Sequence, residues 1–168
     1  MISSGINALI LNPINAEGVA PAIEACQKAD IPVITVDRNV NDGNTAYVGR
    51  DNEEMGRLVG EALVEELGGK DKAEGKILEI QGTAGDTVMM ARRDGFESAI
   101  AEAPGLEVIQ SAYCDYTRSK AVTATQDLLQ SNDGIVAVYG HNDDMSLGAA
   151  QVLQEKGVEG VKVTGVDG

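Results

Sequence analysis

The chain has 168 residues, of which 43% are hydrophobic, 24% charged and only 3% aromatic. This composition is typical of a globular protein and excludes a disordered chain. Thirteen basic residues stand against 27 acidic ones. The resulting net charge of −14 opposes binding to nucleic acid and to anionic lipid, so no nucleic-acid partner is predicted.

The sequence shows neither a membrane-spanning or export segment nor a pattern of paired cysteines. No apolar run approaches the ~20 residues that span a bilayer, and residues 1–5 lack the basic and apolar regions of a signal peptide. Cys26 and Cys114 lie far apart, without a CxxC motif or clustered histidines, which excludes a disulfide scaffold and a zinc site. Each cysteine is predicted to be a small apolar filler, and a single long-range disulfide stays open as the alternative.

Short apolar, β-branched runs alternate along the chain with longer amphipathic stretches, as in parallel strands joined by crossover helices. Strands are predicted at residues 8–11, 32–36, 46–48, 76–80, 107–111, 135–139 and 161–166. Helices are predicted at residues 16–29, 52–67, 87–101, 118–129 and 145–155, where apolar residues recur at three- and four-residue spacing. This order indicates an α/β fold with Rossmann-like, doubly wound parallel sheets. A short helical tail is expected before the first strand.

The two ends of the chain do not fit a finished sheet of this kind. The sequence stops directly after the apolar run 161–166, whereas a buried parallel strand needs helices on both faces. We therefore expect a longer parent protein, with a fold that is incomplete at both ends.

Ligands of open parallel sheets bind beyond the carboxyl ends of the strands, where this sequence places carboxylates, guanidinium groups, amides and a phenol. Such groups suit a neutral polyol, because charged side chains hydrogen-bond hydroxyls strongly and a planar ring covers the C–H face of a sugar. Polar residues after a strand also cap the next helix, and Asn142 or Asp143 would do that well. Capping explains Asp37 and Arg38 less easily, since a turn follows them.

The sequence contains no common catalytic or metal-binding motif. His141 is the only histidine, and neither a GxSxG elbow nor a nucleotide-binding glycine motif follows a strand. His141 is therefore interpreted as a polar residue at a strand end. Adjacent carboxylates such as Asp143 and Asp144 point in different directions on a helix and do not form a hydrolytic pair. The prediction is binding without chemistry, with no enzyme activity, no cofactor and no metal.

Several segments together resemble the periplasmic sugar-binding proteins of bacterial ABC transporters, type I fold, and most closely the ribose-binding group. They are residues 5–13 (GINALILNP), 31–38 (IPVITVDR), 81–85 (QGTAG), 92–96 (RRDGF), 141–149 (HNDDMSLGA) and 165–168 (GVDG). The resemblance implies that residues 1–50 are a partial first lobe, ending in a hinge crossing, and that residues 51–168 are most of a second lobe. It also implies that the missing part of the first lobe supplies one wall of the cleft, so this chain alone is expected to bind sugar poorly.

The resemblance further implies the site. Asp37 and Arg38 would bind sugar hydroxyls from the first lobe. Arg92, Asn142 and Asp167 would do so from the second, and Tyr116 would cover the ring. Arg93 is set aside because Arg92 has the right offset from Gly85.

The function implied by the resemblance is that of a monosaccharide-binding, ribose-like component that closes about a hinge and docks as a monomer on a membrane permease. The parent would be periplasmic or attached to the cell envelope. The alternative is the effector-binding domain of a LacI-type transcription repressor, and an enzyme acting on a sugar ranks third.

Overall fold

The computed structural model describes residues 2–168, which form alternating strands and helices. No helix in that range is both long and apolar enough to cross a membrane. Contacts divide the chain into two compact units: residues up to Asp51 together with Gly85–Val88, and Asn52–Ala84 together with Met89–Gly168. The segment Gly85–Val88 thus belongs to the first unit, although the residues on either side of it belong to the second.

The first unit contains a 3-10 turn η1 (Ile2–Ser4), β1 (Leu9–Leu11), α1 (Ala16–Lys28), β2 (Val33–Val36) and β3 (Ala46–Val48). Its three strands are parallel in the order β1-β2-β3. Helix α1 begins where the Asn15 side chain accepts a hydrogen bond from the Gly18 N–H at 2.9 Å. Its apolar side contributes to a core that includes Ile23, Cys26, Val33 and Val40.

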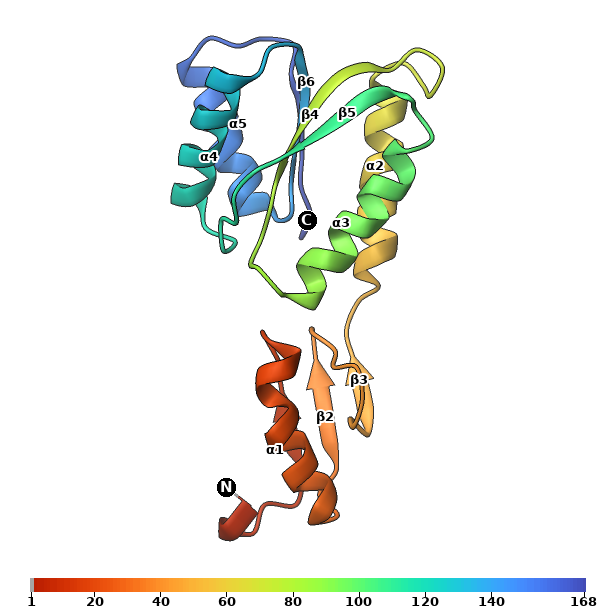
Figure 1. Cartoon of the computed structure of the whole chain (residues 1–168), viewed down its shortest axis with the longest axis vertical. Coiled ribbons are helices and arrows are strands. Elements are labelled where there is room, and N and C mark those ends of the chain that lie inside the picture. Colours follow the sequence, from red (N-terminus) through yellow and green to blue (C-terminus); the bar gives the residue numbers. More distant parts are fainter. Residues whose placement is uncertain (1) are drawn as a thin grey trace. The chain divides into compact units, whose positions relative to one another are not determined.

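The second unit contains α2 (Asn52–Glu66), β4 (Glu74–Ile80), α3 (Thr87–Ile100), β5 (Gly105–Gln110), α4 (Arg118–Ser131), β6 (Ile135–Gly140), α5 (Asp143–Glu155) and β7 (Lys162–Thr164). Its strands are parallel in the order β5-β4-β6-β7. Figure 1 shows α2 and α3 on one face of this sheet and α4 and α5 on the other.

The alternation of side chains along the central strands explains this doubly wound arrangement. On β4, Ile77 packs in one core with Leu63 of α2 and Phe96 of α3. The next residue, Leu78, packs in a second core with Met145 of α5. Because successive side chains point to opposite faces, one apolar strand supplies both cores.

The predicted strands and helices are confirmed, with small shifts at their limits. Strand β5 begins at Gly105, where it pairs with Glu74, and β7 is confined to Lys162–Thr164. Burial of the strands is uneven: β4 and β6 end in buried residues, whereas all three residues of β3 are exposed. Both cysteines are free and buried, as predicted for apolar fillers, and they lie in different cores.

Candidate functional site

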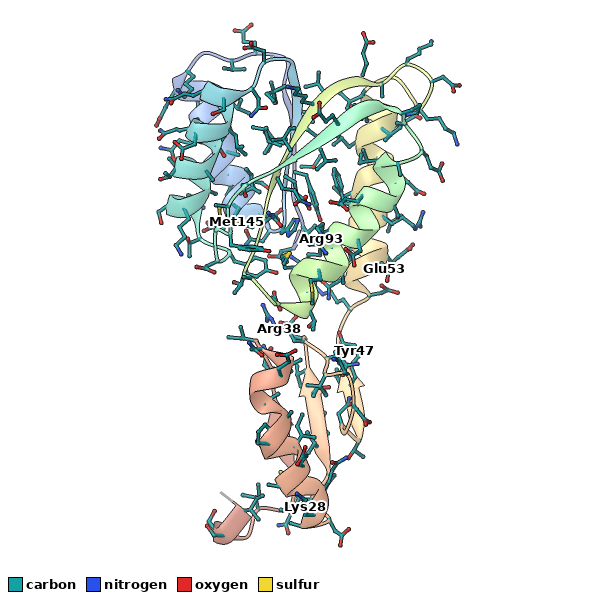
Figure 2. The ribbon with its side chains drawn as sticks, viewed as in Figure 1. Lys28, Arg38, Tyr47, Glu53, Arg93 and Met145 are labelled. Carbon is teal, nitrogen blue, oxygen red and sulfur yellow. The ribbon has the colours of Figure 1, made fainter. Side chains whose placement is uncertain are left out.

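Polar side chains at the ends of β1 and β2 meet in the first unit. Arg38 Nη1 donates to Asp37 Oδ2 at 2.6 Å and lies 3.4 Å from Asn12 Oδ1. On another side of the guanidinium, Arg38 Nε donates to Asp86 Oδ1 at 2.8 Å. The two residues predicted for this unit, Asp37 and Arg38, are therefore joined by an ion pair. Figure 2 labels Arg38 just beyond β2.

The backbone at Asp37 is fixed from two directions. Its N–H donates to Val48 O at 2.9 Å, and its carbonyl accepts from the Tyr47 hydroxyl at 2.9 Å. Burial raises the pKa of the Tyr47 phenol, and the carboxylates of Asp37 and Asp51 raise it further. The hydroxyl therefore stays protonated near neutral pH and remains a donor to Asp37.

Arg92 is the centre of the polar network in the second unit. Its side chain is buried, and its guanidinium donates to Asn52 Oδ1 at 2.9 Å, to the His141 carbonyl, and to Asp167 Oδ1 at 2.9 Å. The neighbouring Arg93 instead pairs with the next carboxylate along the chain, and 27% of its side chain is exposed. The structure thus gives the two arginines different environments, and it joins Arg92 and Asp167, which were both predicted for the site.

Tyr116 and Asn142 form the other predicted pair in this unit. A Cβ on Gly82 would lie 2.4 Å from Tyr116 Cζ, so the phenol ring lies directly against the backbone at Gly82 and would have to shift to admit a side chain there. Asn142 Oδ1 accepts from the Met145 N–H at 2.9 Å and caps α5, while its Nδ2 lies 3.5 Å from Tyr116 O. The capping role proposed for Asn142 is therefore confirmed, and any contact with a ligand would be additional to it.

Backbone conformation singles out the same strand ends. Among residues 2–168, five residues other than glycine have positive φ, and three of them, Asp37 (66°), Tyr116 (56°) and Asp167 (130°), were predicted for the site. The others are Asp30 and Asp115. Such conformations are costly for residues with a Cβ, above all for an aromatic one, and they cluster at ligand sites in proteins.

Sequence reasoning missed a buried pair behind the site. Glu79 and His141 are both fully buried, and His141 Nε2 lies 2.7 Å from Glu79 Oε1. Because His141 Nδ1 accepts from the Gly82 N–H at 3.4 Å, Nε2 carries the proton and donates to the carboxylate. Glu79 Oε2 has no hydrogen-bond partner among residues 2–168. A charged residue inside the apolar run 76–80 was the signal in the sequence.

The Glu79 carboxylate also affects a neighbouring phenol. Burial raises the pKa of the Tyr139 hydroxyl, and the negative charge of Glu79 raises it further. The same hydroxyl lies 3.4 Å from the Arg92 carbonyl. Two further polar residues, Asn52 and Asp86, were also not predicted, although each contacts a predicted arginine.

Both units have parallel α/β structure with polar side chains at the strand ends, which is where open sheets of this class bind small polar ligands. Comparison with known proteins is consistent with this class. The whole range of residues 1–168 matches the family described as periplasmic binding protein domain, and the chain belongs to that family.

Two curated relatives are about a third identical to the chain over the aligned residues. The galactofuranose-binding protein YtfQ of Escherichia coli (strain K12) is 36% identical over 165 residues, covering 94% of this chain and 51% of YtfQ. The ribose import binding protein RbsB of Salmonella typhimurium is 35% identical over 166 residues, covering 98% of this chain and 54% of RbsB. The chain therefore spans about half the length of these curated relatives.

A solved structure is similar in both fold and sequence. The crystal structure of an ABC transporter solute-binding protein from Mycobacterium smegmatis, with bound glycerol, superimposes with a TM-score of 0.91 at 52% identity. The match covers 99% of this chain and 57% of that one. The resemblance inferred from the sequence segments is thereby confirmed at the level of family and fold.

Proposed function

We propose that this chain is part of the substrate-binding component of a sugar ABC transporter and that its ligand is a monosaccharide. The main support for this proposal is that each predicted arginine pairs with a carboxylate at a strand end. Arg38 pairs with Asp37, and Arg92 pairs with Asp167. Side by side, the two groups offer donors and acceptors that match a hydroxyl, which both donates and accepts.

The first unit contributes Asp37 and Arg38 in this proposal, and the second contributes Arg92, Asn142, Asp167 and the ring of Tyr116. The lobes at residues 1–50 and 51–168 stay a prediction; the first compact unit of the structure also includes Asp51 and Gly85–Val88. Closure about a hinge, docking of a monomer on a permease, and a periplasmic or envelope-attached location remain predictions. The comparisons favour the binding protein over the LacI-type repressor, since the relatives named above are binding proteins.

The family is one of binding proteins, and we propose that this member performs no chemistry on its ligand. Among residues 2–168, Asp37 and Asp167 pair with arginines and Asp143 accepts from the Gly168 N–H, an arrangement that suits hydrogen bonding to a ligand. Incubating the protein with glycosides and finding turnover would contradict this part of the proposal.

Nuclear magnetic resonance titration tests the binding proposal, because it detects even the weak binding expected of this chain. A panel of neutral pentoses and hexoses is added to labelled protein, and amide shifts are followed. We expect saturable shifts at Asp37, Arg38, Asn142 and Asp167. Shifts that are absent up to the highest sugar concentration, or that map only elsewhere, would refute the proposal.

Two neighbouring arginines provide a matched pair of variants. Arg92→Gln removes the guanidinium that joins Asn52, His141 and Asp167, and we expect sugar affinity to fall at least tenfold. Arg93→Gln changes the same charge on a more exposed side chain and should leave affinity within twofold. If Arg92→Gln does not fold, Asp167→Asn, at a half-exposed side chain, takes its place.

A further inference from the structure

The side chain of Asp86 is fully buried in the first unit, where its carboxylate meets Arg38. Arg38 Nε lies 2.8 Å from Asp86 Oδ1, and Nη2 lies 3.5 Å from Oδ2. Asp86 Oδ1 also accepts from the Val88 N–H at 3.3 Å, at the start of α3. The carboxylate is thus fixed by its own backbone as well as by the arginine, and it sets the direction in which the guanidinium lies.

Arg38 forms ion pairs with two carboxylates of the first unit. One guanidinium lies between two carboxylates, Asp86 at 2.8 Å and Asp37 at 2.6 Å, so the three side chains carry a formal charge of −1. The Asp86 side chain is 0% exposed, whereas that of Asp37 is 53% exposed. Water therefore screens Asp37 but not Asp86, and the buried carboxylate has the stronger influence on the arginine.

We infer that Asp86 is a positioning residue that orients Arg38 and, by balancing its charge, makes the site select neutral sugars over sugar acids and sugar phosphates. This inference rests on the proposed function. A neutral hydroxyl accepts from Arg38 and donates to Asp37 without disturbing the Asp86 pair. An anionic group would instead lie next to an arginine whose charge Asp86 already balances, with the Asp37 carboxylate beside it. It would lose its hydration without gaining an unpaired cation in return.

The test compares matched neutral and anionic probes on wild type and on Asp86→Asn. The pairs are D-galactose with D-galacturonate, D-glucose with D-glucuronate, and D-ribose with D-ribose 5-phosphate. Wild type should bind the neutral member of a pair more tightly. Asp86→Asn should weaken neutral binding about fivefold and strengthen anionic binding, so that the ratio of the two affinities moves about tenfold or more towards the anion. A carboxylate that only stabilised the fold would change both affinities by the same factor.

Glu24→Gln is the matched control, because Glu24 is an exposed carboxylate of the same unit and lies 3.6 Å from Lys28. It should leave the ratio unchanged. A ratio that stays within twofold of wild type in Asp86→Asn would overturn the inference. If no neutral sugar binds wild type, the proposed function fails, and that result is distinct from binding with an unchanged ratio.

A second measurement needs neither a sugar nor a variant. Proton exchange at Arg38 Nε in the wild-type protein should be at least tenfold slower than at the arginines of the urea-unfolded chain, because Asp86 Oδ1 accepts that hydrogen. Exchange at the unfolded rate would refute the positioning role. This measurement tests the hydrogen bond that orients Arg38 even if Asp86→Asn does not fold.

Discussion

Helices α2 and α3 approach so closely that a single methyl group at Gly56 should separate them. A Cβ at this position would lie 2.1 Å from Arg92 O and 3.0 Å from Phe96 N. The contact is reciprocal, since a Cβ on Gly95 would lie 1.9 Å from Glu53 O. Figure 2 labels Glu53 at the start of α2 and Arg93 on α3, which run side by side in Figure 1.

The magnitude of the effect of Gly56→Ala follows from these distances. Ordinary contact begins at 3.4 Å, so the helices would have to move apart by about 1 Å. Replacing glycine by alanine inside a helix gains roughly 0.5–1 kcal/mol, whereas overpacking a core costs about 1–3 kcal/mol or more. The groups in the way are backbone atoms that cannot rotate aside. We therefore expect a net loss of about 1–2 kcal/mol in the free energy of unfolding.

The assay is urea unfolding followed by circular dichroism, with Gly18→Ala as the control. Gly18 lies in α1, and the atoms nearest to a Cβ there belong to the Asn15 side chain, at 3.6 Å or more, which is ordinary contact. Gly18→Ala should leave the stability of the first unit unchanged or raise it slightly. If Gly56→Ala proves as stable as wild type, or if both variants change stability alike, the argument from backbone contact is wrong.

Two further predictions concern α5 and a buried phenol. Asn142→Ala removes the acceptor of the Met145 N–H and should lower the free energy of unfolding by about 1 kcal/mol. Asn142→Asp keeps an acceptor and should retain most of the wild-type stability. Equal losses of the two variants in urea unfolding would contradict the capping role. Burial raises the pKa of Tyr139 above its usual 10.0. Above pH 10 the unfolded chain therefore loses a proton that the folded chain keeps, so stability should fall as pH rises. Tyr139→Phe should make this fall less steep, and an unchanged slope would argue against a buried neutral phenol.

The elements of the fold were predictable because their signals are local. Apolar runs and three- and four-residue spacing lie within each strand or helix. The exact ends of the strands, in contrast, depend on pairing between segments that are distant in the sequence. Strand β5 begins at Gly105 because that residue pairs with Glu74, and Gly105 has no β-branched side chain that would have indicated a strand. Tertiary contact, rather than propensity, decides such ends.

The candidate site was predictable only in part, for the same physical reason. Asp37 and Arg38 are adjacent and follow a strand, so they stand out in the sequence. Asp86 is 48 positions from Arg38, and Asn52 is 40 positions from Arg92. No local pattern marks a hydrogen bond over such a separation. Glu79 gave a local signal, a carboxylate within a buried strand, but its partner His141 is 62 positions away.

The close helix pair connects the fold to the site. Asn52 is the first residue of α2, and its amide oxygen lies 2.9 Å from Nε of Arg92 in α3. That distance depends on how near the two helices come, and Gly56 and Gly95 allow their backbones to touch. Glycines inside helices lower helix propensity and would be interpreted from sequence as weak points. Here they are what lets a buried arginine reach its partner, so loss of either should weaken ligand binding as well as stability.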